Sequence, residues 1–140
     1  MFGFRSLPRD DRSRMRATRA LFIRHGAEAT PEGRSLRLLR DWLSPAQQEQ
    51  FASKGYFEVV GSDSGKRYRI HAGASANVCE IDERGFLRDG LCFMPMGALP
   101  IGDVMLAQKI ALETRECEVR VVARRFTPNG FCFRQTRPFG

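Results

Sequence analysis

The stretch YFEVVGSDSGKRYRIH, residues 56–71, decides the fold. Two runs rich in β-branched and aromatic residues flank the loop formers Ser62 to Gly65. Strand formers on both sides of such a turn are typical of a β-hairpin. Further strands are expected at NVCEID (77–82) and LCFMP (91–95), with a tight turn at 83–85 between them. The pattern therefore predicts a small antiparallel sheet.

The chain before the hairpin, residues 10–54, has the spacing of three short helices. The first has apolar residues at helical spacing up to a stop at Gly26. Thr30-Pro31 predicts the start of the second helix, whose apolar residues are Leu36, Leu39, Trp42 and Leu43, with Arg34, Arg37 and Arg40 facing away. Ser44-Pro45-Ala46-Gln47 reads as a capping box that opens the third helix, which is anchored by Phe51 and ends near Gly55.

One longer helix is expected after the strands. Asp103 is a candidate cap, and Val104, Ala107, Ile110 and Ala111 form the apolar stripe of a helix that extends to about Phe126. Residues 116–121 also alternate between polar and apolar side chains, which leaves a further strand open as an alternative. The fold class is therefore α+β, with short basic N-terminal helices, an antiparallel sheet of three to five strands and a C-terminal helix packed on the sheet.

The chain is predicted to form one domain. Residues 1–9 contain Gly3 and Pro8 without a period and are expected to be a flexible arm. Residues 10–126 form a single α+β domain, with a helical part at 10–54 and the sheet plus helix at 56–126. Residues 127–140 form a C-terminal tail. A length of 140 residues and a hydrophobic content of 42% suit one folded domain with its own core.

Composition excludes several classes of protein. No run approaches 18 apolar residues, and the N-terminus lacks the pattern of a signal peptide. We therefore expect a soluble, cytoplasmic protein with no membrane partner. Cys79, Cys92, Cys117 and Cys132 include no Cys-x-x-Cys pair, so they are expected to be reduced thiols and no metal or cofactor is predicted.

The positive charge is concentrated at the N-terminus. The formal net charge is +7, and residues 1–40 hold ten arginines against four carboxylates. The planar guanidinium binds phosphate in a bidentate manner. Nucleic acid or another polyanion is therefore the expected partner, whereas a solvated helix face is the alternative interpretation. The candidate contacts are Arg12, Arg14, Arg16, Arg19 and Arg24, with a second patch at Lys66, Arg67, Tyr68 and Arg69.

Phenylalanines near the two termini indicate a different class of function. They lie outside the periodic elements, and exposed apolar residues in tails often dock onto a partner protein. A protein–protein adaptor or a small assembly subunit is therefore the alternative function. Its candidate docking residues are Phe2, Phe4, Phe131, Phe133 and Phe139.

Motifs of catalysis are weak in this chain. Arg24-His25-Gly26 resembles the signature of the histidine phosphatases, which implies a phosphoryl-transfer enzyme built on His25 as a third hypothesis. GSDSGK (61–66) is one residue short of a phosphate-binding loop and is followed by a strand, so we reject that function. His25 and His71 have no spacing to Cys79 or Cys92 that favours a metal site or a dyad. No catalytic residue is predicted.

The block from Tyr56 to Glu113, and above all GDVMLAQKIALE (102–113), resembles a family of small uncharacterised proteins of alphaproteobacteria and their phages. The resemblance implies that the strands and the last helix form one module, and it implies no activity. The order of elements is also similar to that of the SWIM-type ββα module, although its metal ligands are absent.

Overall fold

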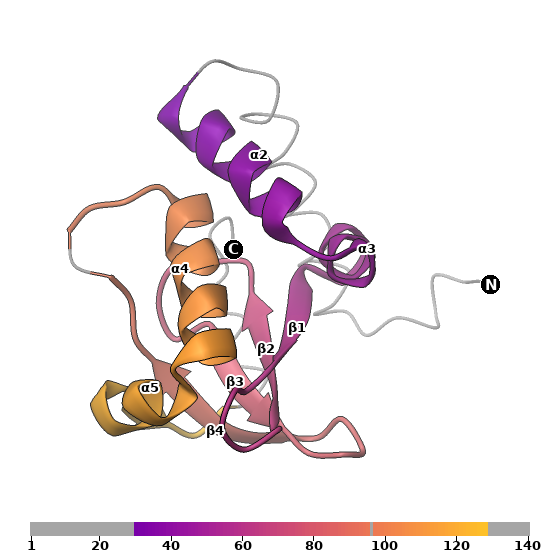
Figure 1. The fold of residues 1–140 in the computed structure, drawn as a ribbon, viewed down its shortest axis with the longest axis vertical. Coiled ribbons are helices and arrows are strands. Elements are labelled where there is room, and N and C mark those ends of the chain that lie inside the picture. Colours follow the sequence, from indigo (N-terminus) through magenta and orange to yellow (C-terminus); the bar gives the residue numbers. More distant parts are fainter. Residues whose placement is uncertain (1–29, 96, 129–140) are drawn as a thin grey trace.

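The computed structural model describes residues 30–95 and 97–128. Along the chain, two helices are followed by four strands, then by two more helices and by a last strand of the same sheet (Figure 1). In chain order they are α2 (Pro31–Trp42), α3 (Pro45–Lys54), β1 (Tyr56–Val60), β2 (Arg67–His71), β3 (Val78–Ile81), β4 (Leu87–Cys92), α4 (Ile101–Thr114), α5 (Glu116–Val122) and β5 (Arg124–Phe126). The predicted α+β class is confirmed. The predicted helix before residue 27 lies outside the described residues.

The starts of α2 and α3 follow the predicted caps. The Thr30 hydroxyl accepts a hydrogen bond from the Gly33 amide at 3.0 Å. Ser44 and Gln47 form the reciprocal capping box, and Gly55 ends α3 in the left-handed region with φ +78. Leu36, Leu39 and Leu43 are buried as expected. The prediction for Trp42 is wrong, because its side chain is 58% exposed.

The five strands form an antiparallel meander in the order β1-β2-β3-β4-β5. In the first hairpin Val59 pairs with Tyr68, and Tyr68 in turn pairs with Glu80 of β3. The pairing of β3 with β4 shifts between Cys79 and Ile81. The fourth strand was predicted at 91–95, but β4 begins at Leu87 and ends at Cys92, because the residues opposite Val78–Ile81 are those from Leu87 to Leu91.

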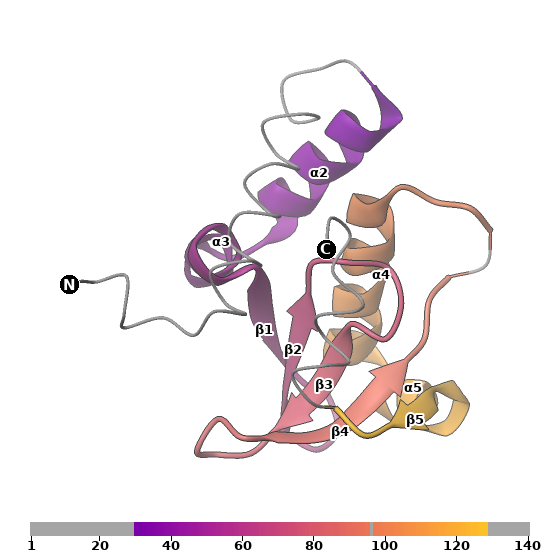
Figure 2. The same ribbon diagram turned by 180° about the vertical axis from the view of Figure 1, so that it is seen from behind.

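The helix α4 crosses one face of the sheet and builds the main core there (Figures 1 and 2). Side chains from the sheet, including Phe57, Ile70 and Leu91, pack with Met105 and Leu112 of α4 in one cluster. Helix α2 packs on the other side of α4, where a Cβ at Gly102 would lie 2.5 Å from the Ser35 carbonyl oxygen. As a result α4 is buried on two sides, whereas the sequence predicted one apolar stripe. The prediction for Ile110, a residue of that stripe, is wrong, because Ile110 is 40% exposed.

The predicted long helix from Asp103 to about Phe126 is wrong. Helix α4 begins at Ile101, with Asp103 in its first turn, and ends at Thr114. Arg115 breaks the helix with φ −144, and the short helix α5 follows. Residues 116–121 are therefore helical, so the alternative strand there is wrong as well. The sheet gains its fifth strand a few residues later, where Arg124–Phe126 pairs with β4. Across residues 30–95 and 97–128, no helix has the length and apolar character needed to span a bilayer.

Candidate binding surfaces

Many predicted contact residues lie outside the described part of the chain. This holds for the arginines of the first predicted helix and for the terminal phenylalanines, which are Arg12, Arg14, Arg16, Arg19, Arg24, Phe2, Phe4, Phe131, Phe133 and Phe139. His25 of the phosphatase-like string also lies outside it. The candidate contacts that lie within the described residues are the second predicted patch, Lys66 to Arg69, and the arginines of α2.

The cations of the predicted hairpin patch are paired with carboxylates. Arg67 Nη1 and Arg69 Nε lie 3.3 and 3.2 Å from the two carboxylate oxygens of Glu58. Lys66 Nζ lies 3.3 Å from Glu80 Oε2 on the other face of the sheet. Arg69 also lies over the ring of Tyr56, 4.5 Å from its centroid. These ion pairs offset much of the positive charge that the sequence indicated for the hairpin.

A polar hollow of about 700 Å³ lies at the end of this hairpin and mixes both signs of charge. Its cations are Lys66, Arg67, Arg84 and Arg88, and its carboxylates are Glu80, Asp82 and Glu83. Asp82 accepts backbone hydrogen bonds from Phe86 and Arg84, each at 2.9 Å, and these bonds lower its pKa. An anion in this hollow would lie beside three carboxylates, which repel it. The hollow is therefore a weaker site for a polyanion than its four cations alone indicate.

Tyr68, the aromatic residue of the predicted patch, is fully buried. Its position in the register places it on the core face of the sheet, between Val59 and Glu80. The hydroxyl donates a hydrogen bond to Glu116 and accepts one of 2.8 Å from Arg120 Nη1. Burial and the hydrogen bond to Glu116 raise the pKa of Tyr68. The ring is therefore part of the core and cannot stack on a base in this conformation.

Glu116 at the start of α5 is held by the turn of the first hairpin. Its Oε1 accepts hydrogen bonds from the backbone amides of Asp63 and Ser64 at 2.9 and 2.7 Å, and the Ser64 hydroxyl bonds Oε2. Burial acts to raise the pKa of this carboxyl, but hydrogen bonds from Ser64, Tyr68 and the two amides outweigh burial and lower it to about 2. The loop that resembles a phosphate-binding loop thus already holds an anion, which is a carboxylate of the same chain.

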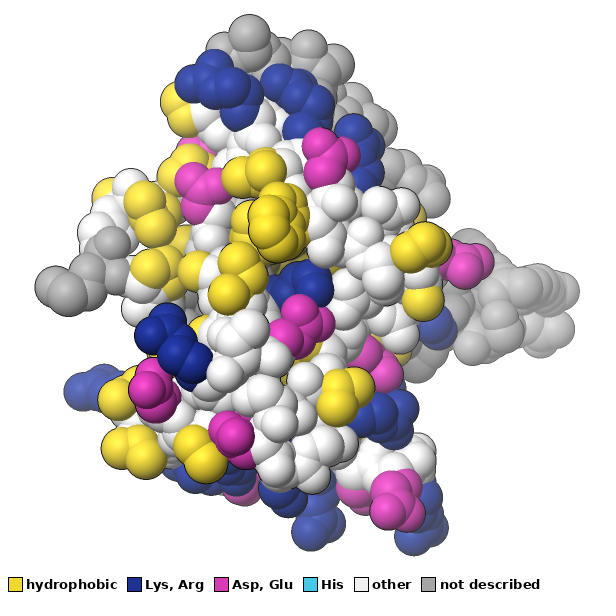
Figure 3. All heavy atoms as spheres, in the orientation of Figure 1, with side chains coloured by type: hydrophobic (Ala, Val, Ile, Leu, Met, Phe, Trp, Pro, Cys, Tyr) yellow, Lys and Arg dark blue, Asp and Glu magenta, His cyan; other side chains and the backbone are white. Residues whose placement is uncertain are grey.

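Helix α2 carries three arginines, of which Arg34 and Arg40 are exposed and Arg37 is half-buried. Arg34 lies away from the buried Leu36 and Leu39, whereas Arg40 follows Leu36 by four residues and lies on the same side of the helix. Figure 3 shows that Lys and Arg side chains gather over α2, with hydrophobic side chains beside them over α2 and α4. The spacing of these arginines was visible in the sequence, but they were not among the predicted contact residues.

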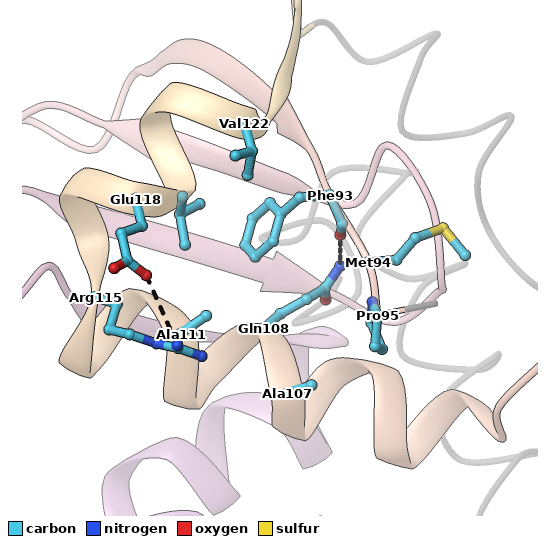
Figure 4. A pocket seen from close by; sticks show the side chains of 10 residues that line it. Phe93, Met94, Pro95, Ala107, Gln108, Ala111, Arg115, Glu118 and Val122 are labelled. Atoms are coloured by element: carbon cyan, nitrogen blue, oxygen red, sulfur yellow. Dashed lines mark hydrogen bonds and ion pairs between the residues drawn. The ribbon is translucent and has the colours of Figure 1, made fainter. Parts of the chain in front are cut away.

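An apolar pocket of about 330 Å³ lies between α4, α5 and the residues after β4 (Figure 4). Phe93 and Val122 face each other above Ala111 of α4, and the ion pair of Arg115 with Glu118 lies at the rim. Gln108 supports the pocket wall, because its amide donates to the Phe93 carbonyl oxygen at 2.9 Å. Gln108 also forms a reciprocal amide pair with the buried Asn77. The pocket was not expected from the sequence, because one continuous helix from Asp103 to about Phe126 would have no break between α4 and α5 to form it.

The structure brings one histidine and one cysteine together that the sequence did not pair. His71 Nε2 lies 3.9 Å from Cys79 Sγ, on neighbouring strands, and both side chains are buried. Cys79, Cys92 and Cys117 form no disulfide. Among the side chains that the structure describes, no three His, Cys, Asp or Glu groups converge in a way that would hold a metal ion.

Comparison of the chain with protein-family models, curated proteins and solved structures finds no significant match.

Proposed function

We propose that this chain is a non-enzymatic binding protein that contacts nucleic acid, or a nucleoprotein assembly, through its arginine-rich N-terminal third. The observation that supports this proposal best is the group of three arginines on α2, of which Arg34 and Arg40 are exposed and Arg37 is half-buried. Residues 12–24 contribute the further arginines Arg12, Arg14, Arg16, Arg19 and Arg24 just before this helix in the chain. A series of guanidinium groups is suited to the phosphate backbone of a nucleic acid.

The hairpin cations contribute less to the proposed contact than their number alone indicates. Lys66, Arg67 and Arg69 each have a carboxylate within 3.3 Å, so a phosphate would have to compete with Glu58 or Glu80. Binding to the phosphate backbone carries little sequence information. The proposed activity is therefore weakly sequence-specific and strongly dependent on salt.

Two charge-matched variants test the proposal. One replaces Arg34, Arg37 and Arg40 by glutamine, and the other replaces Arg84, Arg88 and Arg124, which are exposed on the β3–β4 turn, on β4 and on β5. Fluorescence anisotropy with a labelled oligonucleotide measures the affinity of each at one low salt concentration. We expect the α2 variant to lose at least tenfold in affinity and the control to lose much less. Equal losses would show that only net charge matters and would contradict a contact through α2.

A protein–protein adaptor is the second candidate, and the pocket of Figure 4 favours it. Met94, Val121 and Val122 expose 48%, 83% and 73% of their surface around α5, which is a large apolar area for an exposed helix. Binding of a protein partner there would survive moderate salt and would be reduced by Val122→Asp. The α2 arginine variant would leave such binding unchanged, so the two candidates are separable.

A further inference from the structure

The surface formed by α2, α4 and α5 contains both a protruding indole and an apolar hollow. Trp42, the last residue of α2, is 58% exposed, and Leu38 one turn earlier is 45% exposed. The apolar pocket of Figure 4 lies along α4, where it is lined by Ala107 and Ala111. Large apolar side chains exposed next to an apolar pocket are typical of a protein interaction site.

Ile110 of α4 lies between the indole and the pocket. On a regular helix Ile110 is about 80° from Gly102 and about 60° from Ala107, in opposite directions around the axis. Gly102 packs on Ser35 of α2, and Trp42 follows Ser35 by seven residues, so Trp42 lies on the same side of α2. Ile110 is itself 40% exposed, and Figure 3 shows hydrophobic side chains over α2 and α4 on this face. The indole and the pocket therefore belong to one apolar face and flank Ile110.

We propose that this face is the interface of a symmetric dimer, in which Trp42 of each copy inserts into the apolar pocket of the other. A two-fold axis beside Ile110 would interchange the indole and the pocket, because they lie on opposite sides of that residue. Such self-complementarity is the requirement of a two-fold interface. The inference goes beyond the proposed function and does not depend on a contact with nucleic acid.

The pocket suits an indole in size and in chemistry. Its volume is about 330 Å³, whereas a cavity of about 150 Å³ is enough to hold a benzene ring. Phe93 and Val122 face each other across it and offer aromatic and aliphatic surface. The side-chain amide of Gln108 is already bonded to Asn77 and to the Phe93 carbonyl oxygen, so it demands no polar ligand. A tryptophan that fills such a pocket is a typical anchor of a protein interface.

The charges beside the indole and beside the pocket are complementary. Asp41, the residue before Trp42, is exposed. Arg115 lies at the rim of the pocket with 67% of its side chain exposed, and its ion pair with the exposed Glu118 is 3.7 Å long. Insertion of Trp42 would bring Asp41 of one copy toward Arg115 of the other. The contact involves fewer side chains than the roughly 20–30 residues a side of a standard interface, so we expect a weak dimer that depends on concentration.

Sedimentation velocity of the full chain without nucleic acid, from about 5 to 500 µM, tests for the dimer. We expect the mass to rise with concentration from that of the monomer to twice that value. The emission of Trp42, the only tryptophan of the chain, should shift to the blue over the same range, because the indole leaves water. A monomer at every concentration would overturn the inference. Emission that is blue-shifted at every concentration without association would also overturn it, since the indole would then be covered within its own chain.

Single variants test the two halves of the contact. Trp42→Ala and Val122→Asp are each expected to raise the Kd of the dimer roughly 30-fold or more. Val60→Asp is the matched control, because Val60 is 57% exposed at the end of β1 and does not line the pocket, and this variant should associate as the wild type does. Circular dichroism verifies that each variant is folded. A dimer that Trp42→Ala leaves unchanged, or that Val60→Asp weakens as much as Val122→Asp, would overturn the inference.

A mixture of two variants tests the insertion itself. Trp42→Ala keeps the pocket and contains no tryptophan, whereas Val122→Asp keeps the indole and has a damaged pocket. A mixed dimer retains one of the two contacts, and neither variant retains any with itself. At a concentration at which neither variant associates alone, we expect the emission of Val122→Asp to shift to the blue when Trp42→Ala is added. No shift in this mixture would overturn the insertion of Trp42 into the pocket.

Discussion

The hydroxyl of Tyr68 in β2 donates a hydrogen bond to the carboxylate of Glu116, which follows 48 residues later at the start of α5. Arg120 of the same helix donates to the Tyr68 hydroxyl and to Glu80, so a buried tyrosine joins a carboxylate and a guanidinium. The turn of the first hairpin is part of the same network through Ser64. This network explains how a helix of seven residues is held in a defined place against the sheet.

Glu116 is expected to make the stability of the protein depend on pH. Its pKa is lowered from the ordinary 4.5 to about 2 in the folded state, so its stabilisation is present above pH 4.5 and is lost as the pH falls toward 2. The linked free energy is roughly 3 kcal/mol. Glu116→Gln should therefore unfold at lower urea concentration at neutral pH, and its deficit should shrink as the pH is lowered below 4.5. Glu118→Gln, an exposed carboxylate on the same helix, is the control, and an equal deficit in both variants would be inconsistent with this account.

Tyr68→Phe is expected to lower the free energy of unfolding by about 1–3 kcal/mol, because the buried Glu116 and the half-buried Arg120 each lose a partner. Urea unfolding followed by circular dichroism measures this change. The affinity for nucleic acid should stay as in the wild type, since the ring is fully buried. A weaker affinity for nucleic acid in a fully folded variant would show that Tyr68 contacts the ligand and would contradict its assignment to the core.

Gly102→Ala is expected to lower the melting temperature, against the usual preference of helices for alanine over glycine, which is about 1 kcal/mol. The added Cβ would lie 2.5 Å from the Ser35 carbonyl oxygen, so α2 and α4 would have to move apart. Overpacking of this kind costs about 1–3 kcal/mol. A melting temperature above that of the wild type would show that α2 does not pack closely on α4.

Replacing Glu58 by glutamine tests whether the hairpin cations contribute to binding independently of the arginines of α2. Arg67 and Arg69 would lose their shared carboxylate, so the hairpin would gain positive potential without any change in α2. We expect a modest gain in affinity for nucleic acid, of about two- to fivefold at low salt. A gain that disappears when Arg67 and Arg69 are also replaced would assign the effect to these two cations. No gain at all would show that the hairpin lies away from the bound nucleic acid.

The sequence predicted those parts of the fold that depend on local signals. The caps at Thr30 and Ser44 and the hairpin turn are specified by residues that contact each other within a few positions. The break at Arg115 was missed, because it depends on Glu116 reaching a turn more than fifty residues away. Trp42 was misplaced for a related reason. Trp42 and Leu43 both follow Leu39 at helical spacing, and only the packing of α2 decides which of them is buried.

The dependence of the affinity on salt tests the central claim most directly. If about six phosphates are engaged, a plot of log Kobs against log salt has a slope of about −4 on a single strand and about −5 on duplex DNA. Replacing Arg34, Arg37 and Arg40 by glutamine should make the single-strand slope shallower by about 2. The account predicts such a steep slope, and its reduction in the variant, from anisotropy titrations of the full chain. A slope near zero, or no binding at low salt, would contradict it.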